Sequence, residues 1–172
     1  HVADRAQLAV AGEVGAGARL GLVVERVLED RGRGLLVDVA ALPWQTTRFP
    51  GIEIKTLIFD RASGLATSLM RMAPGAALPD HEHVLIEQTW VLEGHLVDRT
   101  GPDEGIECKA GQFIWRPAGS RHSAWSPNGG LMIAIFQIPN KFFAEGGAET
   151  DMAGSDWEAL WGGVHQARSG GG

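Results

Sequence analysis

Three histidines and one glutamate form the part of this sequence best suited to chemistry. His81 and His83 are two residues apart, Glu87 follows four residues later, and His122 comes from a separate segment. Side chains at positions i and i+2 point to the same face of a β-strand, so the first three converge if their strand is regular. Imidazole nitrogens and a carboxylate oxygen suit zinc, iron, nickel, copper or manganese. The pattern predicts one divalent transition metal ion per chain, bound by these four residues.

Glycines bracket both segments. Gly75, Gly94 and Gly111 fall where we expect turns between short strands. Glycine adopts the positive φ that such turns need without steric cost. The two segments therefore read as strands joined by tight turns.

The two segments together resemble the sequence motifs of the cupin superfamily. The first motif, with its His-x-His pair and later glutamate, is met by Gly75, His81, His83, Glu87 and Gly94. The second motif is met by Gly111, Pro117, Gly119 and His122. It departs only at Ser126, where the family has an asparagine that is not a metal ligand. The resemblance therefore implies a cupin barrel whose metal is bound by the residues named above.

The stretch 37–138 looks most like the cupin domain at the sensor end of zinc-dependent anti-sigma factors. It also looks like the small oxygenases that cleave rings or diketones. The anti-sigma factors carry a helical zinc domain with cysteine ligands ahead of the cupin domain. Residues 1–34 contain no cysteine, so we do not expect an anti-sigma role.

Strand patterns dominate the middle of the chain. The 44% hydrophobic content and 24 glycines fit many short strands within one domain. Alternating or β-branched runs predict strands over 52–60, 65–72, 86–93, 95–98, 106–109, 112–116 and 131–138. This pattern indicates an all-β jelly-roll barrel or sandwich over residues 35–140.

The two ends read differently. Residues 1–34 form an N-terminal extension in which 19–30 has the pattern of a short helix. In the C-terminal segment, 141–172, we predict a short helix with Ser155 as its N-cap and Glu158 completing a capping box, followed by a flexible tail. The two tryptophans of that helix are four apart and should share one face.

Several side chains near the second motif are candidates for a substrate pocket. Phe113, Trp115 and Trp125 could form an apolar wall for a flat organic molecule. Arg116 and Arg121 could bind an anionic substrate at the mouth, or could be solvated charges at the rim.

Charge and cysteine content exclude some partners. A net charge of −6 and a pI near 5.5 argue against nucleic acid or an anionic membrane. The single cysteine cannot form an internal disulfide, and no apolar run reaches membrane-spanning length. We therefore expect a cytoplasmic protein.

The resemblance to the cupins, together with the number of metal ligands, implies a metal-dependent oxygenase, a dioxygenase that uses iron on a small enolisable carbonyl compound or aromatic ketone. The chain contains no tyrosine, so acid or base work would fall to Glu87, another carboxylate, a histidine or a metal-bound water. Glu87 is the predicted catalytic residue. Two alternatives stay open: a non-catalytic domain that senses or binds a small molecule through the metal, and a metal-dependent isomerase or lyase. The predicted strand over 131–138 is apolar on both faces. Together with the strands of 52–72 it offers more apolar surface than one small barrel can bury, so we expect a homodimer.

Overall fold

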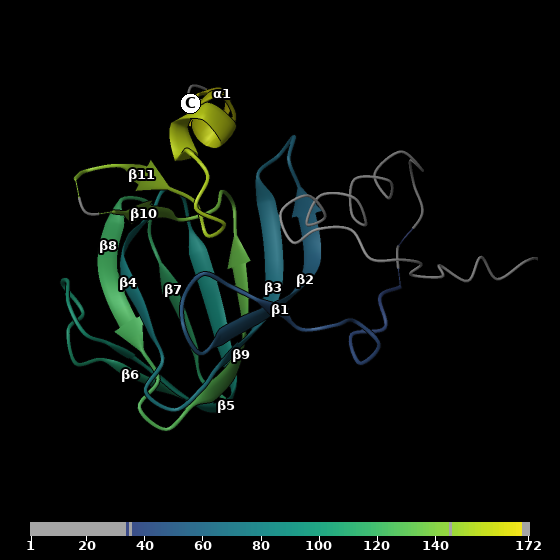
Figure 1. Ribbon diagram of the computed structural model, residues 1–172, viewed down its shortest axis with the longest axis vertical. Coiled ribbons are helices and arrows are strands. Elements are labelled where there is room, and N and C mark those ends of the chain that lie inside the picture. The colour runs from purple at the N-terminus through teal and green to yellow at the C-terminus, as the bar shows by residue number, and fades with distance from the viewer. Residues whose placement is uncertain (1–33, 35, 145, 170–172) are drawn as a thin grey trace, which may run out of the picture.

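The computed structural model describes residues 34, 36–144 and 146–169 (Figure 1). The predicted N-terminal helix at 19–30 and the end of the predicted tail lie outside these residues. The strands are β1 (Gln45–Thr46), β2 (Ile52–Asp60), β3 (Leu65–Met72), β4 (Ala77–His83), β5 (Glu87–Asp98), β6 (Glu107–Lys109), β7 (Phe113–Arg116), β8 (Ser120–Trp125), β9 (Gly130–Phe136), β10 (Lys141–Phe143) and β11 (Glu149–Thr150). A π-helical turn, η2 (Glu158–Gly162), and helix α1 (Gly163–Ser169) follow.

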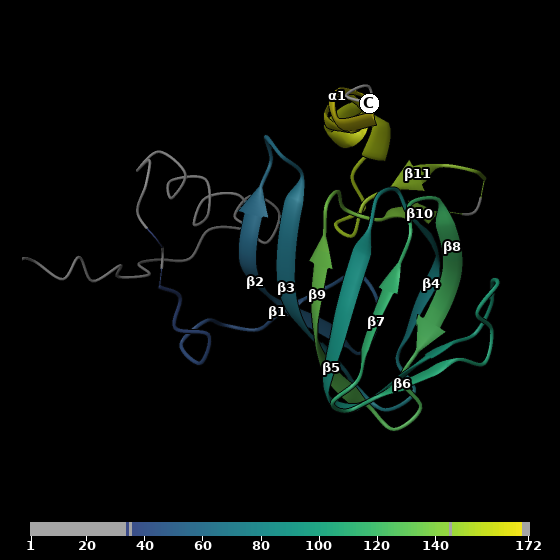
Figure 2. The ribbon, with the colours of Figure 1, turned by 180° about the vertical axis from the view of Figure 1, so that it is seen from behind.

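The strands form a curved antiparallel half-barrel, which confirms the predicted all-β fold. One half contains β1, β2, β3, β9, β5 and β7, and the other contains β6, β5, β8, β4, β10 and β11. Figure 2 shows β9, β5 and β7 as neighbours on one side of the molecule. The strands predicted over 52–60 and 65–72 are confirmed, and they pair as a hairpin in which Ile52 lies opposite Met72 and Asp60 opposite Leu65.

Strand β5 belongs to both halves. Its first part pairs with β7 and β9, and its last residues pair with β6 and β8. The register to β9 shifts between Val91 and Glu93, which marks a β-bulge. Before the bulge the buried side chains are at 87, 89 and 91, and after it they are at 96 and 98. The extra residue therefore changes which alternate positions face inward.

Gly94 is part of this irregularity and not of a turn, contrary to the prediction. Its φ is 67°, and a Cβ there would lie 2.0 Å from the carbonyl oxygen of Gly129. Any other residue would combine backbone strain with a backbone clash. The prediction of one strand before Gly94 and another after it is thus replaced by a single bent strand.

Two apolar clusters hold the barrel together. The larger one fills the interior and includes Met70, Met72, Val91, Met132 and Phe142. The smaller one lies under the C-terminal helix and consists of Val84, Ile138, Trp157 and Trp161. Both tryptophans are buried, so the prediction that they share a packing face is confirmed.

The C-terminal helical segment begins differently from the prediction. Ser155 makes no cap, and Asp156 Oδ1 instead accepts a hydrogen bond of 2.9 Å from the backbone of Ala159. The helical residues continue from Glu158 to Ser169. Figure 1 shows α1 at the end of the barrel near β10 and β11.

Candidate metal centre

Strands β4 and β8 bring three histidines together inside the barrel. His81 lies opposite His122 in the antiparallel register, and His83 is two residues further along the same face of β4. Their exposed fractions are 2%, 5% and 1%, in that order. Strand alternation therefore places all three imidazoles in the interior, as the i, i+2 spacing predicted.

The three rings form what we call the histidine cluster. One potential ligand atom from each of His81, His83 and His122 lies within 4.8 Å of the other two. Among the histidine, cysteine, aspartate and glutamate side chains of the described residues, these three histidines form the group whose ligand atoms lie this close together. The cluster is therefore able to hold a metal ion.

The outer nitrogen of each ring faces an oxygen atom. His81 Nδ1 lies 2.8 Å from the backbone oxygen of Pro79. His83 Nδ1 lies 3.1 Å from Asn140 Oδ1 and 3.0 Å from Glu87 Oε2. His122 Nδ1 lies 3.0 Å from Asp98 Oδ1, a close contact without the alignment of a hydrogen bond.

These contacts favour one tautomer of each ring. An oxygen acceptor beside each Nδ1 favours the proton on that nitrogen, which leaves the Nε2 lone pair of each neutral ring unprotonated. The Nε2 atoms of His83 and His122 are 2.9 Å apart. Two lone pairs at that distance repel each other unless a cation lies beside both.

The spacing also fits a transition metal ion. Two nitrogens that are each about 2.05 Å from an ion, at a right angle to one another, are about 2.9 Å apart. Histidines whose second nitrogen is held by a carboxylate or carbonyl are the usual form of metal-binding histidine. The donor set suits zinc, iron, nickel, copper or manganese and does not select one of them.

Burial keeps His81 and His83 uncharged at neutral pH. Desolvation, followed by the other two histidines, lowers the pKa of His81 to about 3. Desolvation, His122 and the Arg116 charge lower the pKa of His83 to about 3. Neutral imidazoles are the form that binds metals, so His81 and His83 can bind a metal near neutral pH without first losing a proton.

Glu87 lies beside the cluster, on the outer side of one ring. Its Oε2 contacts His83 Nδ1, the nitrogen that faces away from His122, and its Oε1 accepts a 3.3 Å hydrogen bond from Thr89. The structure thus brings Glu87 to the site that the spacing predicted. It places the carboxylate behind a ligand, however, and not among the converging atoms.

Three further polar residues complete the site, and the sequence did not single out their role. Asp98 and Asn140 are buried and contact the outer nitrogens of His122 and His83. Arg116 is 3% exposed and contacts both Asp98 and Glu87, so it is not a charge at the rim. Burial would raise the pKa of Asp98, but the contacts with His122 and Arg116 outweigh it and leave that pKa lowered.

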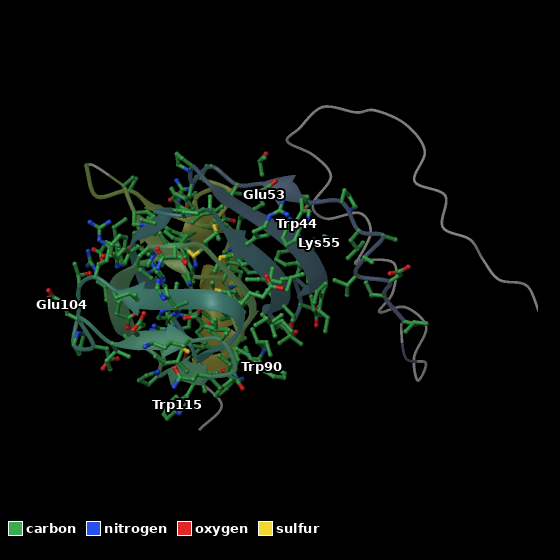
Figure 3. All side chains as sticks on the ribbon, turned by 90° about the horizontal axis from the view of Figure 1, so that it is seen from below. Trp44, Glu53, Lys55, Trp90, Glu104 and Trp115 are labelled. Atoms are coloured by element: carbon green, nitrogen blue, oxygen red, sulfur yellow. The ribbon has the colours of Figure 1, made fainter. Side chains whose placement is uncertain are left out.

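The predicted substrate pocket is not formed. Phe113 and Trp115 are 55% and 57% exposed, while the alternate residues of β7, Ile114 and Arg116, face inward. Figure 3 shows Trp115 at the margin of the molecule. The prediction was wrong because closeness in sequence to the second motif does not decide which face of a strand a residue occupies.

Arg121 and Trp125 face outward for the same reason. On β8 the residues that alternate with them, at 122 and 124, are buried. Arg121 Nε donates a 2.8 Å hydrogen bond to Asp80, and the Arg99 guanidinium lies over the Trp125 ring. An open depression of about 890 Å³ lies on this outer face, and Asp80, Arg99 and Arg121 contribute to its lining, which contains none of the three histidines.

The barrel and its buried histidines define a cupin-type protein able to hold a metal ion. A family model of the ChrR Cupin-like domain matches residues 33–141. The chain therefore belongs to the ChrR Cupin-like domain family. Comparison with curated proteins gives no match.

Solved structures share the same fold. A candidate acetylacetone dioxygenase from Methylibium petroleiphilum is 22% identical, with a TM-score of 0.62 over 77% of this chain and 94% of the other. An acetylacetone dioxygenase from Acinetobacter johnsonii is 19% identical, with a TM-score of 0.59 over 78% and 91%. A protein of unknown function with a cupin-like fold from Ralstonia eutropha is 22% identical, with a TM-score of 0.60 over 81% and 89%. These similarities support the cupin fold.

The described residues contain no helix of the length and apolar character needed to cross a membrane. The expected cytoplasmic location stays a prediction.

Proposed function

We propose that this protein is a metal-dependent dioxygenase that acts on a small enolisable ketone. The observation that carries the proposal is the convergence of His81, His83 and His122, whose outer nitrogens each face an oxygen. Three histidines leave coordination positions of a six-coordinate ion open for the oxygen atoms of a substrate and for dioxygen. A bound iron ion would supply Lewis acidity and one-electron chemistry.

Glu87 is the candidate proton acceptor. Enolisation of a ketone requires a base near its α-carbon, and Glu87 is a buried carboxylate next to the histidine cluster. Its Oε1 atom has a long hydrogen bond to Thr89 and retains lone-pair capacity. The Glu87 carboxylate would hold the proton while the product forms.

The structural neighbours support the choice of substrate class. Two of them carry the name of acetylacetone dioxygenase, an activity on a small 1,3-diketone. At 22% identity or less they support the fold directly and the substrate only by analogy. The burial of the cluster fits a small apolar substrate, because the site excludes bulk water.

The decisive experiment compares iron and zinc in the same protein. Metal-free protein is loaded anaerobically with Fe²⁺ or Zn²⁺, then mixed with air-saturated buffer and a panel of 1,3-diketones and hydroxyaryl ketones. We expect the iron form to consume dioxygen in step with loss of one ketone. The zinc form should not, because zinc has no accessible redox change.

The other outcomes separate the alternatives. Loss of a ketone without oxygen uptake, in the zinc form as well, would identify an isomerase or lyase. A panel left untouched by every metal form, together with tight binding of one ketone, would favour sensing or binding. The match to the ChrR Cupin-like domain is the observation that keeps this second candidate open.

A further inference from the structure

Arg116 lies at the centre of the polar contacts behind the histidine cluster. Its guanidinium is buried, with Nη2 donating a 2.6 Å hydrogen bond to Asp98 Oδ1 and Nη1 lying 3.6 Å from Glu87 Oε2. One planar cation thus contacts two buried carboxylates. Arginine suits this position because its donors form a rigid fork that can serve two acceptors at once.

Each of these carboxylates contacts a different histidine of the cluster. Glu87 Oε2 is 3.0 Å from His83 Nδ1, and Asp98 Oδ1 is 3.0 Å from His122 Nδ1. Two chains of contacts therefore run from Arg116 to two potential ligands. The same oxygen atom that contacts the guanidinium also contacts the ring in each chain.

The fold has to bend a strand to make this arrangement. Glu87 lies directly opposite Arg116 in the pairing of β5 with β7. Asp98 is at the far end of β5, an odd number of positions away, and would face outward if the strand alternated regularly. The β-bulge after Val91 brings both carboxylates to the interior.

His81 is held in another way. Its Nδ1 contacts the backbone oxygen of Pro79 within its own strand, with no carboxylate between it and Arg116. His83 has a second acceptor in Asn140. The orientation of the three rings should therefore depend on Arg116 to different degrees. The dependence should be strongest for His122, weaker for His83 and absent for His81.

We propose that Arg116 is a positioning residue of the metal centre, which fixes the two carboxylates that orient two of the three histidines. The inference rests on the metal centre of the proposed function but not on its substrate or reaction. Carboxylates behind metal-binding histidines orient the rings and raise their basicity, and their loss typically weakens metal binding ~10- to 100-fold. Removal of Arg116 releases both carboxylates at once.

The test uses Arg116→Met and Arg116→Lys in the full chain. Arg71→Met is the matched control, because Arg71 is an exposed arginine that pairs with Glu53 on the neighbouring strand. Zinc affinity is measured by competition with a chelator, and the melting temperature of each metal-free protein is recorded. We expect zinc binding to weaken ~10- to 100-fold in Arg116→Met, less in Arg116→Lys, and not at all in the control.

A second readout reports on the rings directly. Long-range ¹H–¹⁵N spectra of the metal-free proteins at constant pH show which nitrogen of each histidine carries the proton. In Arg116→Met we expect the Nδ1–H form of His122 to lose its dominance, that of His83 to weaken, and that of His81 to persist. A general loosening of the barrel would change all three alike.

The outcomes are distinct. Wild-type protein that binds no zinc would overturn the metal centre, and the inference with it. Wild-type binding with unchanged affinity in a folded Arg116→Met variant would overturn the inference alone. A lower melting temperature with unchanged histidine spectra would also overturn it, because Arg116 would then serve stability only. If Arg116→Met does not fold, Arg116→Lys decides by the same two measurements.

Discussion

His83 and His122 approach each other through their Nε2 atoms at 2.9 Å, while the Nδ1 atom of each ring lies 3.0 Å from a buried carboxylate. The Nδ1 atom of each ring thus contacts a carboxylate, while the Nε2 atoms of the two rings point towards each other. They are 39 residues apart in sequence, so folding itself assembles this pair.

The first prediction concerns metal content. His83→Ala or His122→Ala should lose stoichiometric metal, because each removes one of three converging nitrogens. Wild-type protein should gain about 2.7 kcal/mol of unfolding free energy at a metal concentration 100 times the dissociation constant, and the variants should not. Elemental analysis and thermal melts measure both effects.

His165→Ala is the control, because His165 lies on α1, where its ring packs near Trp157. It should keep full metal content. Full occupancy in a triple variant of the histidine cluster would count against the site.

The second prediction concerns pH. In the folded, metal-free protein the pKa values of His81 and His83 are about 3, against an ordinary value of 6.5. Between these values the unfolded chain binds more protons than the folded one, so stability is full above pH 6.5 and falls as the pH drops towards 3. Each histidine contributes a slope of up to about 1.4 kcal/mol per pH unit.

Urea midpoints measured in a chelating buffer from pH 8 to pH 4 test this. The variant His81→Gln should show a shallower decline than the wild type. Midpoints that stay constant from pH 7 to pH 4 would contradict the burial of neutral histidines.

The third prediction separates two roles of Glu87. In Glu87→Gln the amide oxygen still accepts a hydrogen bond from His83, so metal affinity should stay close to that of the wild type. Oxygenase turnover should fall ~10²- to 10⁴-fold, as for the loss of a general base. A large loss of metal would instead show that metal binding depends on the charge of the Glu87 carboxylate, and would contradict a purely catalytic role.

Glu82→Gln provides the matched control for this variant. Glu82 lies between His81 and His83 on β4 and faces the other side of the sheet. Its substitution should leave both metal affinity and turnover unchanged.

The sequence predicted the parts of the site that depend on local spacing. The i, i+2 histidines share a face in any regular strand, and the hairpin from Ile52 to Met72 follows from alternation and a turn. Asp98 could not be placed in this way, because the bulge in β5 reverses the alternation before it. Trp115 was misplaced for a similar reason, since the face of a short strand depends on its pairing partner and not on its neighbours in sequence.

The fourth prediction is a homodimer formed through the outer face of β7, β5 and β9. Trp90, Phe113 and Trp115 are each more than half exposed there, and Ile133 and Ile135 occupy the same outward rows of β9. Figure 3 shows Trp90 and Trp115 at the same margin of the molecule. Exposed apolar clusters of this kind are typical of protein interfaces.

Sedimentation at micromolar concentration should show a dimer, whose interface would bury more than roughly 2,000 Å² in total. Trp90→Lys should shift it towards monomer without loss of metal. A wild-type monomer at this concentration would refute the prediction.

The bulge in β5 has a consequence for changes of chain length. Glu87 and Asp98 both face inward only because one extra residue lies between the two halves of the strand. Deletion of a single residue such as Leu92 would turn the side chains of one half to solvent, and with them one of the two carboxylates. Single substitutions at the outward-facing positions of β5 other than Gly94 can be accommodated, but insertions and deletions in this strand should be excluded wherever the site is kept.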